Sequence, residues 1–267
     1  MARRWEELRS PEFRTLDPAS TVAVMPLGAI EQHGPHLPVM VDARLVDEIT
    51  DRALARLADN LPVLRLPTIP IGKSSEHVWF PGTLTFSGET VLRMWREVGE
   101  SVARAGVRKL VMVNGHGGQI QPMQMVARDL RVGAGMFAVA CNWWQFGYPA
   151  GLFSTEERQF GIHAGAIETS MMQAIEPSLV RMELADDFVP VMRSQMAQRF
   201  PALAAAGAAG FGWMAQDLHH SGAAGDATTA SAKAGSAVLD HAATGLAALI
   251  REVVSYPLEN LRTSTAW

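Results

Sequence analysis

The hydrophobic and polar positions of the chain follow two alternating patterns, which predict alternating strands and helices. Short, almost continuously apolar runs, typical of buried strands, occupy residues 21–27, 63–71, 109–113 and 136–142, and Pro67 and Pro70 break up the second of them. Apolar residues spaced at three or four positions, typical of helices that cover a core, occupy 42–57, 89–105, 121–132, 164–175 and 230–254. Repeated strand-then-helix units predict an α/β fold with a mainly parallel sheet and helices on both faces.

The sequence gives no reason to divide the chain into more than one domain. We find no internal repeat and no change of composition that marks a linker, so we expect a single domain over residues 1–267. The segment 202–212 is rich in Ala and Gly and is consistent with either a flexible crossing or a helix of small residues. Trp213 and Met214 belong either to a subunit interface or to the core.

Composition narrows the class of protein. The net charge of −4 gives no electrostatic reason to expect binding to nucleic acid or to an anionic membrane. The single cysteine, Cys141, excludes an internal disulfide and suits a reducing compartment. The amino-terminal segment has no apolar signal core, and no apolar run approaches eighteen residues. We therefore expect a soluble cytoplasmic protein with no membrane or nucleic-acid partner.

The segment EQHGPHLPVMVD, residues 31–42, directly follows the first predicted strand and concentrates ionisable side chains. Glu31, His33 and Asp42 offer the mixture of oxygen and nitrogen ligands that zinc or manganese accepts. Charged groups next to a buried strand are costly unless something pairs with them, and a metal ion pairs several at once. This segment therefore predicts part of a metal site.

Further polar and aromatic groups follow two other predicted strands. His116 lies in the glycine-rich turn NGHGGQ, and Trp144 follows the strand that ends near residue 142. His163 and Glu168 flank the start of the next predicted helix. Because the carboxyl ends of parallel strands meet at one edge of a sheet, we expect these groups to converge there.

Each of these residues also has an ordinary structural interpretation. His33 and His36 alone are explained as hydrogen-bonded loop histidines, and His36 keeps that interpretation. Asp42 is a suitable N-cap for the helix that it begins, and Glu168 suits the positive end of a helix dipole. The joint placement of His33, Asp42, His116 and Glu168 favours a metal site.

Other catalytic motifs fail on spacing. Gly72, Lys73 and Ser74 resemble the end of a phosphate-binding loop, but Pro67 stands where that loop requires glycine. The sequence has no G-x-S-x-G, no G-x-G-x-x-G, no H-E-x-x-H and no zinc-finger spacing.

Four motifs together resemble the creatininase family. They are EQHGPHLP followed by Asp42, then SSEHVWFPGT, VNGHGGQ and HAGAIETS, in this order, and the resemblance runs from about Val22 to the carboxyl-terminal helix. It implies a three-layer α/β/α fold, a site for two divalent metal ions (zinc, manganese or iron), a cytoplasmic location and assembly as a homohexamer.

The resemblance also implies roles for individual residues. The implied metal ligands are Glu31, His33, Asp42, His116 and Glu168, with Asp42 bridging both ions. His163 is implied as the acid or base near the leaving group. Ser74, His77 and Trp144 occupy positions that line the substrate pocket, although Trp144 is explained equally well as an ordinary core or interface aromatic.

The activity implied is hydrolysis of a C–N amide bond by water activated between the two metal ions. Creatinine itself is not expected as the substrate, because aromatic and acidic contacts are missing. Gly117 and Gly118 stand where creatinine-hydrolysing enzymes carry Tyr-Glu, and Gln159 and Phe160 stand where they carry Trp-Asp. The loop with Glu76 and His77 also differs, and Gln119 replaces a common asparagine.

We therefore expect an amidohydrolase for a small cyclic amide or a formamide. Two alternatives remain open. The first is a peptide-trimming member of the same family, of the mycofactocin type, and the second is a metal-binding protein without catalysis.

Overall fold

The computed structural model describes residues 3–193, 199–200, 202–203, 205, 209–262 and 264–265. Within these residues the main sheet has five strands in the order β1-β3-β2-β4-β5, and every pair is parallel. The strands are β1 (Arg3–Arg4), β2 (Val22–Leu27), β3 (Val63–Arg65), β4 (Lys109–Asn114) and β5 (Phe137–Asn142). The register pairs Leu27 with Asn114 and Asn114 with Asn142, so three strands end level at one edge of the sheet.

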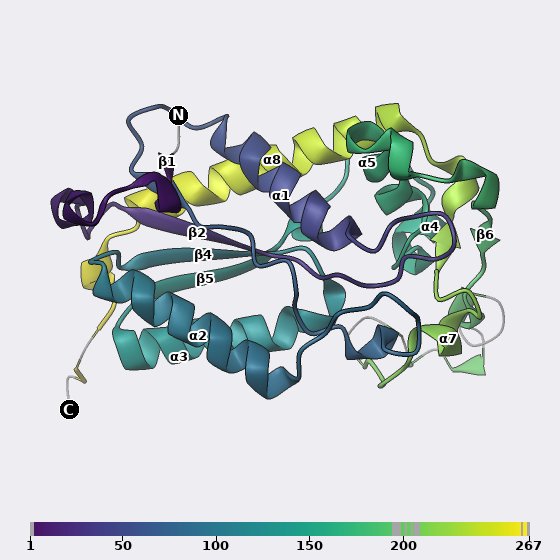
Figure 1. Ribbon diagram of the computed structural model, residues 1–267, viewed down its shortest axis with the longest axis horizontal. Coiled ribbons are helices and arrows are strands. Elements are labelled where there is room, and N and C mark those ends of the chain that lie inside the picture. The colour runs from purple at the N-terminus through teal and green to yellow at the C-terminus, as the bar shows by residue number, and fades with distance from the viewer. Residues whose placement is uncertain are drawn as a thin grey trace.

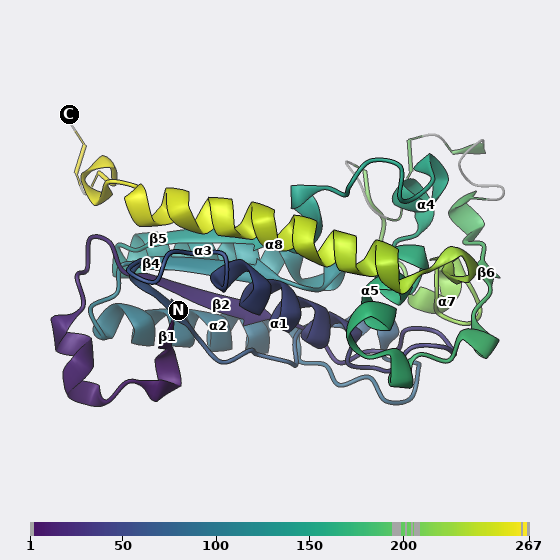
Figure 2. The same cartoon turned by 90° about the horizontal axis from the view of Figure 1, so that it is seen from above.

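Helices cover both faces of the sheet, which confirms the three-layer prediction. Figure 1 shows α1 (Val41–Leu54) and α8 (Ala232–Ser255) on one side of the strands and α2 (Gly88–Arg104) and α3 (Ile120–Ala134) on the other. Figure 2 shows smaller elements gathered at one end of the molecule, among them α5 and the antiparallel strand β6. These elements are α4 (Thr155–Phe160), α5 (Ala166–Ile175), α7 (Ala215–Leu218), β6 (Asp187–Phe188) and its partner strand β7 (Gly225–Asp226).

The central strands β2 and β4 are apolar throughout because each face packs against a helical layer. Val22, Val24 and Val111 point into the core shared with α1, α5 and α8. The alternate residues Ala23 and Met25 point into the core shared with α2 and α3. Side chains alternate between the faces of a strand, so burial of both faces requires a continuous apolar run.

Two sequence predictions about local structure need correction. The strand expected over 63–71 is regular only at Val63–Arg65, because Pro67 and Pro70 cannot donate ladder hydrogen bonds. Asp42 is not the N-cap of its helix, because α1 begins at Val41 and its N-cap is Met40. The Asp42 carboxylate lies instead among the candidate metal ligands described below.

All the predicted helices are present, and none of their ends differs from the structure by more than three residues. The Ala/Gly-rich segment 202–212 includes residues 204 and 206–208, which lie outside the described residues, so neither prediction for it is tested. Trp213 and Met214 are half-buried. Among the described residues, no helix has both the length and the apolar character needed to cross a bilayer.

The packing of α8 on α5, the helix that carries Glu168, gives a stability prediction. A Cβ atom at Gly235 would lie 1.9 Å from the Ser170 carbonyl oxygen of α5. We expect Gly235→Ala to lower the free energy of unfolding by about 1–3 kcal/mol, the usual cost of overpacking. Urea denaturation measures this change.

Gly133→Ala is the matched control, because no atom lies within 4 Å of a Cβ atom at that exposed helical position. Removing glycine there should stabilise the protein by about 0.4–1 kcal/mol. Similar effects of the two substitutions would contradict the close approach of α5 and α8.

Candidate metal centre

The candidate ligands come from four chain segments that meet at the carboxyl edge of the sheet. Glu31 and His33 follow β2, Asp42 lies in the first turn of α1, His116 follows β4, and Glu168 lies in the first turn of α5. Glycine permits the close approach of two of these segments, since a Cβ atom at residue 115 would lie 2.6 Å from the backbone oxygen of Asp42.

Asp42 belongs to two sets of ligand atoms. In the first set, His116 Nδ1 lies 3.1 Å from Glu31 Oε2 and 3.2 Å from Asp42 Oδ2. In the second set, His33 Nε2 lies 3.4 Å from Asp42 Oδ1 and 3.8 Å from Glu168 Oε2. The ligand atoms of each set lie within 4.8 Å of one another, close enough to surround one ion.

Burial of these groups strongly perturbs their ionisation. Burial raises the pKa of Glu31 to about 7, against the opposing effect of His116. Burial also disfavours the charged form of His33, but Asp42, Glu168 and Glu31 together outweigh it and raise the pKa of His33 to about 9. The pKa of Asp42 is lowered, because His33 and His116 outweigh the burial of that carboxyl. His33 is therefore protonated at neutral pH, and its positive charge offsets part of the negative charge of the carboxylates.

The donor atoms fit a metal ion. Glu31 Oε1, His33 Nε2 and Asp42 Oδ2 are buried and have no hydrogen-bond partner among the described residues. Buried polar atoms are normally paired, and unpaired ones clustered in one place indicate a missing ion or water. The mixture of carboxylate oxygens and imidazole nitrogens suits zinc or manganese.

Backbone and amide contacts orient the two candidate histidine ligands. His33 Nδ1 lies 3.0 Å from the Glu31 carbonyl oxygen and donates to it, which leaves Nε2 facing Asp42 as the candidate ligand atom. The backbone N–H of His116 donates to Asn114 Oδ1, and Gln119 donates to the same oxygen. Gln119 therefore supports the His116 turn through Asn114, and its extra methylene does not reach the ligand cluster.

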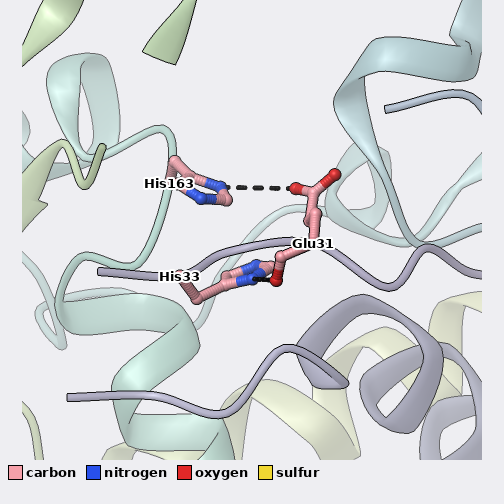
Figure 3. A group of neighbouring side chains, drawn as sticks. All are labelled: Glu31, His33 and His163. Atoms are coloured by element: carbon pink, nitrogen blue, oxygen red, sulfur yellow. Dashed lines mark hydrogen bonds and ion pairs between the residues drawn. The ribbon is translucent and has the colours of Figure 1, made fainter. Parts of the chain in front are cut away.

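His163 lies beside the cluster with one nitrogen fixed and the other directed inward. Its Nε2 donates to the Gln32 carbonyl oxygen at 2.7 Å, and its Nδ1 lies 3.6 Å from Glu31 Oε1 (Figure 3). Its ring lies 4.2 Å from the His33 ring and 4.4 Å from the His77 ring, between centroids. Burial, with His33 and His77 adding to it, holds the pKa of His163 well below its usual value, so the ring is neutral at pH 7.

Glu31, His33 and His163 also form a set whose ligand atoms lie within 4.8 Å of one another. This geometry allows His163 to contact an ion directly, and it is an alternative to the acid–base role. The two roles differ in their effect on metal content, which the His163 variant proposed below separates.

Gln32 is a site residue that the sequence reasoning missed. Its side-chain Nε2 donates to His77 Nδ1 at 2.7 Å and to the Gly222 carbonyl oxygen at 2.9 Å. Because an amide nitrogen can only donate, His77 Nδ1 accepts this hydrogen bond, and the neutral ring carries its proton on Nε2, which lies 3.4 Å from Glu31 Oε1. The only sequence signal for this role was the position of Gln32 between two candidate ligands.

The three predicted pocket residues lie in different surroundings. Ser74 Oγ donates a close hydrogen bond to Glu31 Oε2, and His77 contacts Glu31 as described above. Both residues therefore border the ligand cluster. Trp144 packs on the core cluster that includes α8 and lies perpendicular to Trp143, so its place in a substrate pocket stays a prediction.

His36 lies apart from the candidate ligand sets. Its Nε2 contacts Thr169 Oγ1 at 2.8 Å, and its ring stacks on Phe188. This arrangement agrees with the structural interpretation that the sequence favoured for it.

Ala164 connects His163 to Glu168 in a strained conformation. Its φ of 56° lies in the left-handed region, which non-glycine residues enter at a cost of about 1–3 kcal/mol. In this conformation its backbone N–H donates to Glu168 Oε2 at 2.6 Å. Antiparallel hydrogen bonds between His163 and Ala224 hold the segment in place.

Comparison with known proteins adds a family context. The family model described as creatininase, creatinine amidohydrolase, matches residues 6–250. A mycofactocin precursor peptide peptidase from Mycobacterium tuberculosis is 36% identical over 186 residues, which is 66% of this chain and 67% of that protein. Creatinine amidohydrolase from Pseudomonas putida is 30% identical over 189 residues, which is 63% of this chain and 70% of that protein.

A solved structure shares the fold over nearly the whole chain. It is a mutant creatininase complexed with creatine, with a TM-score of 0.75 and 25% identity. The match covers 96% of this chain and 100% of that one.

The shared position of Asp42 gives a prediction about metal stoichiometry. We expect Asp42→Asn to weaken binding of both ions by more than the roughly 10–100-fold that loss of a merely supporting partner costs. Glu168→Gln is the control. Glu168 belongs to one of the two sets that contain Asp42, so its substitution should weaken the binding of one ion only. Metal analysis after dialysis and titration calorimetry measure both. Full retention of two ions by Asp42→Asn would contradict the bridging role.

Proposed function

The chain belongs to the creatininase family of metal-dependent hydrolases, and we propose that it cleaves an amide C–N bond of a peptide. The observation that carries the hydrolytic assignment is the pair of buried ligand sets that share Asp42. Pairs of divalent ions are recurrent in metal-dependent hydrolases, and Asp42 would hold both ions here.

The choice of a peptide rests on the relatives and on missing contacts. Identity is 36% to a mycofactocin precursor peptide peptidase and 30% to a creatinine amidohydrolase. Gly117 and Gly118 carry no side chain that could hold a flat ring such as creatinine. A small cyclic amide or formamide, which the sequence alone favoured, is the second candidate, and the similarity to creatinine amidohydrolase supports it.

The ligand sets fit two divalent cations, zinc or manganese, and bound cations supply Lewis acidity that lowers the pKa of water and polarises a carbonyl group. Glu31, Asp42 and His116 would hold one cation, and His33, Asp42 and Glu168 the other. The buried surroundings of these side chains exclude bulk water, which strengthens every charge interaction in the site.

His163 is suited to move a proton during the reaction. The Gln32 carbonyl oxygen holds the proton on Nε2, so the lone pair of Nδ1 is directed into the site. A neutral imidazole in this orientation can accept a proton from the attacking water and pass it to the departing nitrogen. The amide of Gln32 holds the neighbouring His77 in its own fixed tautomer.

Covalent catalysis by the chain's own nucleophiles is disfavoured. The Ser74 hydroxyl donates to Glu31 and has no histidine base among its hydrogen-bond partners in the described residues. Burial raises the pKa of the Cys141 thiol to about 12, so it is not a thiolate at neutral pH. These two observations favour direct attack by water over attack by either side chain.

A substrate panel tests the proposed function. The protein is loaded with zinc or manganese and incubated with short peptides, formamides and cyclic amides that include creatinine. We expect peptide cleavage, detected by mass spectrometry as two fragments, and no cleavage by Asp42→Asn treated in the same way. Formate release would favour a formamide, and ring opening would give a single product. Absence of all three would contradict the hydrolytic assignment.

The acid–base role of His163 has its own test. We expect His163→Ala to keep both ions and to lower kcat by about a hundredfold or more, the usual contribution of a general acid or base. His220→Ala is the matched control, because His220 is exposed and lies outside the ligand sets. Wild-type kcat in His163→Ala would contradict the role, and loss of an ion would instead support His163 as a ligand.

The homohexamer and the cytoplasmic location implied by the resemblance stay predictions. Size-exclusion chromatography with light scattering tests the first, since a hexamer would have six times the mass of the 28.9 kDa chain.

A further inference from the structure

The two ring nitrogens of His116 face different carboxylates. Nδ1 faces Glu31 and Asp42, within the first ligand set. Nε2, on the opposite side of the ring, lies 3.1 Å from Oε1 of Glu76. The carboxylate is close enough to act on the ring by its charge, although His116 Nε2 has no hydrogen-bond partner among the described residues. Glu76 therefore approaches His116 from the side away from the other ligands.

The position of Glu76 is defined by its own neighbours. Glu76 lies in a short 3₁₀ helix, Ser75–His77, and its side chain is only 12% exposed. Lys73 Nζ lies 3.7 Å from its second oxygen and donates to the backbone oxygen of Gly118. These contacts tie the loop that carries Glu76 to the turn that carries His116.

Gly118 provides the space that the Glu76 carboxylate occupies. A Cβ atom at Gly118 would lie 1.7 Å from Glu76 Oε1 and 2.5 Å from His116 Nε2. Any side chain at this position would displace Glu76 or the imidazole. The glycine and the glutamate are therefore two parts of one arrangement around His116.

We propose that Glu76 is the positioning residue for His116: its negative charge beside Nε2 favours the proton on that nitrogen, so that the Nδ1 lone pair is free for an ion held with Glu31 and Asp42. The inference rests on the metal centre of the proposed function. Histidine ligands commonly donate their second ring N–H to a carboxylate, which fixes the tautomer and increases the basicity of the ligating nitrogen. Glu76 itself is not a ligand of that ion, because it lies on the far side of the ring.

Metal titration of the wild type, Glu76→Gln and Glu76→Ala tests the inference. A chelator-competition titration with zinc alone resolves the two affinities. We expect Glu76→Ala to weaken one of the two ions by about 10–100-fold and to leave the other within threefold. Glu76→Gln keeps an oxygen acceptor without the charge, so its zinc affinity should lie between those of Glu76→Ala and the wild type. This conservative variant also distinguishes a specific effect on affinity from misfolding.

Glu89→Gln is the matched control, because it removes the same charge from an exposed glutamate at the start of α2. It should leave both affinities unchanged. Combining Glu76→Ala with Glu168→Gln identifies the affected ion, since the two substitutions should weaken different ions and leave neither bound tightly.

Two outcomes would overturn the inference: unchanged affinities in both Glu76 variants, or equal weakening of both ions. Hydrolysis is not measured in this test. Selective weakening in a protein that hydrolyses nothing would therefore overturn the proposed function and leave the role of Glu76 intact. If the protein hydrolyses a substrate and its Glu76 variants bind both ions normally, the role of Glu76 is overturned and the proposed function stands.

Discussion

The structure depends on the burial of ionisable side chains at the carboxyl edge of a parallel sheet. Glu31, His33 and Asp42 are at most 2% exposed, yet each carries or can carry a charge. Isolated charges in such a place are too costly to persist, so each group must be matched by a proton, an opposite charge or a cation. The level ends of β2, β4 and β5 supply the rigid platform on which these groups converge.

Much of the fold and part of the candidate site could be predicted from the sequence, for reasons that particular residues show. β2 and β4 are buried on both faces, so their residues form unbroken apolar runs that the chain itself reveals. The motif histidines and carboxylates are likewise conspicuous next to such runs. The orientation of the Asp42 side chain could not be predicted from the sequence, because an acidic residue at the start of a helix is equally consistent with N-capping. The sequence showed that Pro67 and Pro70 break up the strand after residue 63, but not that the regular part ends at Arg65.

The contributions of Gln32 and Glu76 could not be predicted, because they depend on contacts between distant segments. The Gln32 amide donates to His77, which lies in a different loop, and to the Gly222 carbonyl oxygen. These acceptors are known only from the folded structure. Glu76 and Gly118 were each noted as departures from creatinine-hydrolysing enzymes, and only their contact shows that they occupy one space. In this chain the Glu76 carboxylate lies beside His116 in the space that a side chain at Gly118 would need.

The origin of the ligands in four separate segments has a consequence for folding. An ion held by Glu31, Asp42 and His116 would join the loop after β2, the start of α1 and the turn after β4 as a cross-link does. The second ion would add the start of α5, far along the chain. Such a cross-link forms only when the sheet edge is complete, so its binding energy is added to the stability of the native state. The free energy of unfolding would then rise with the concentration of free metal ion.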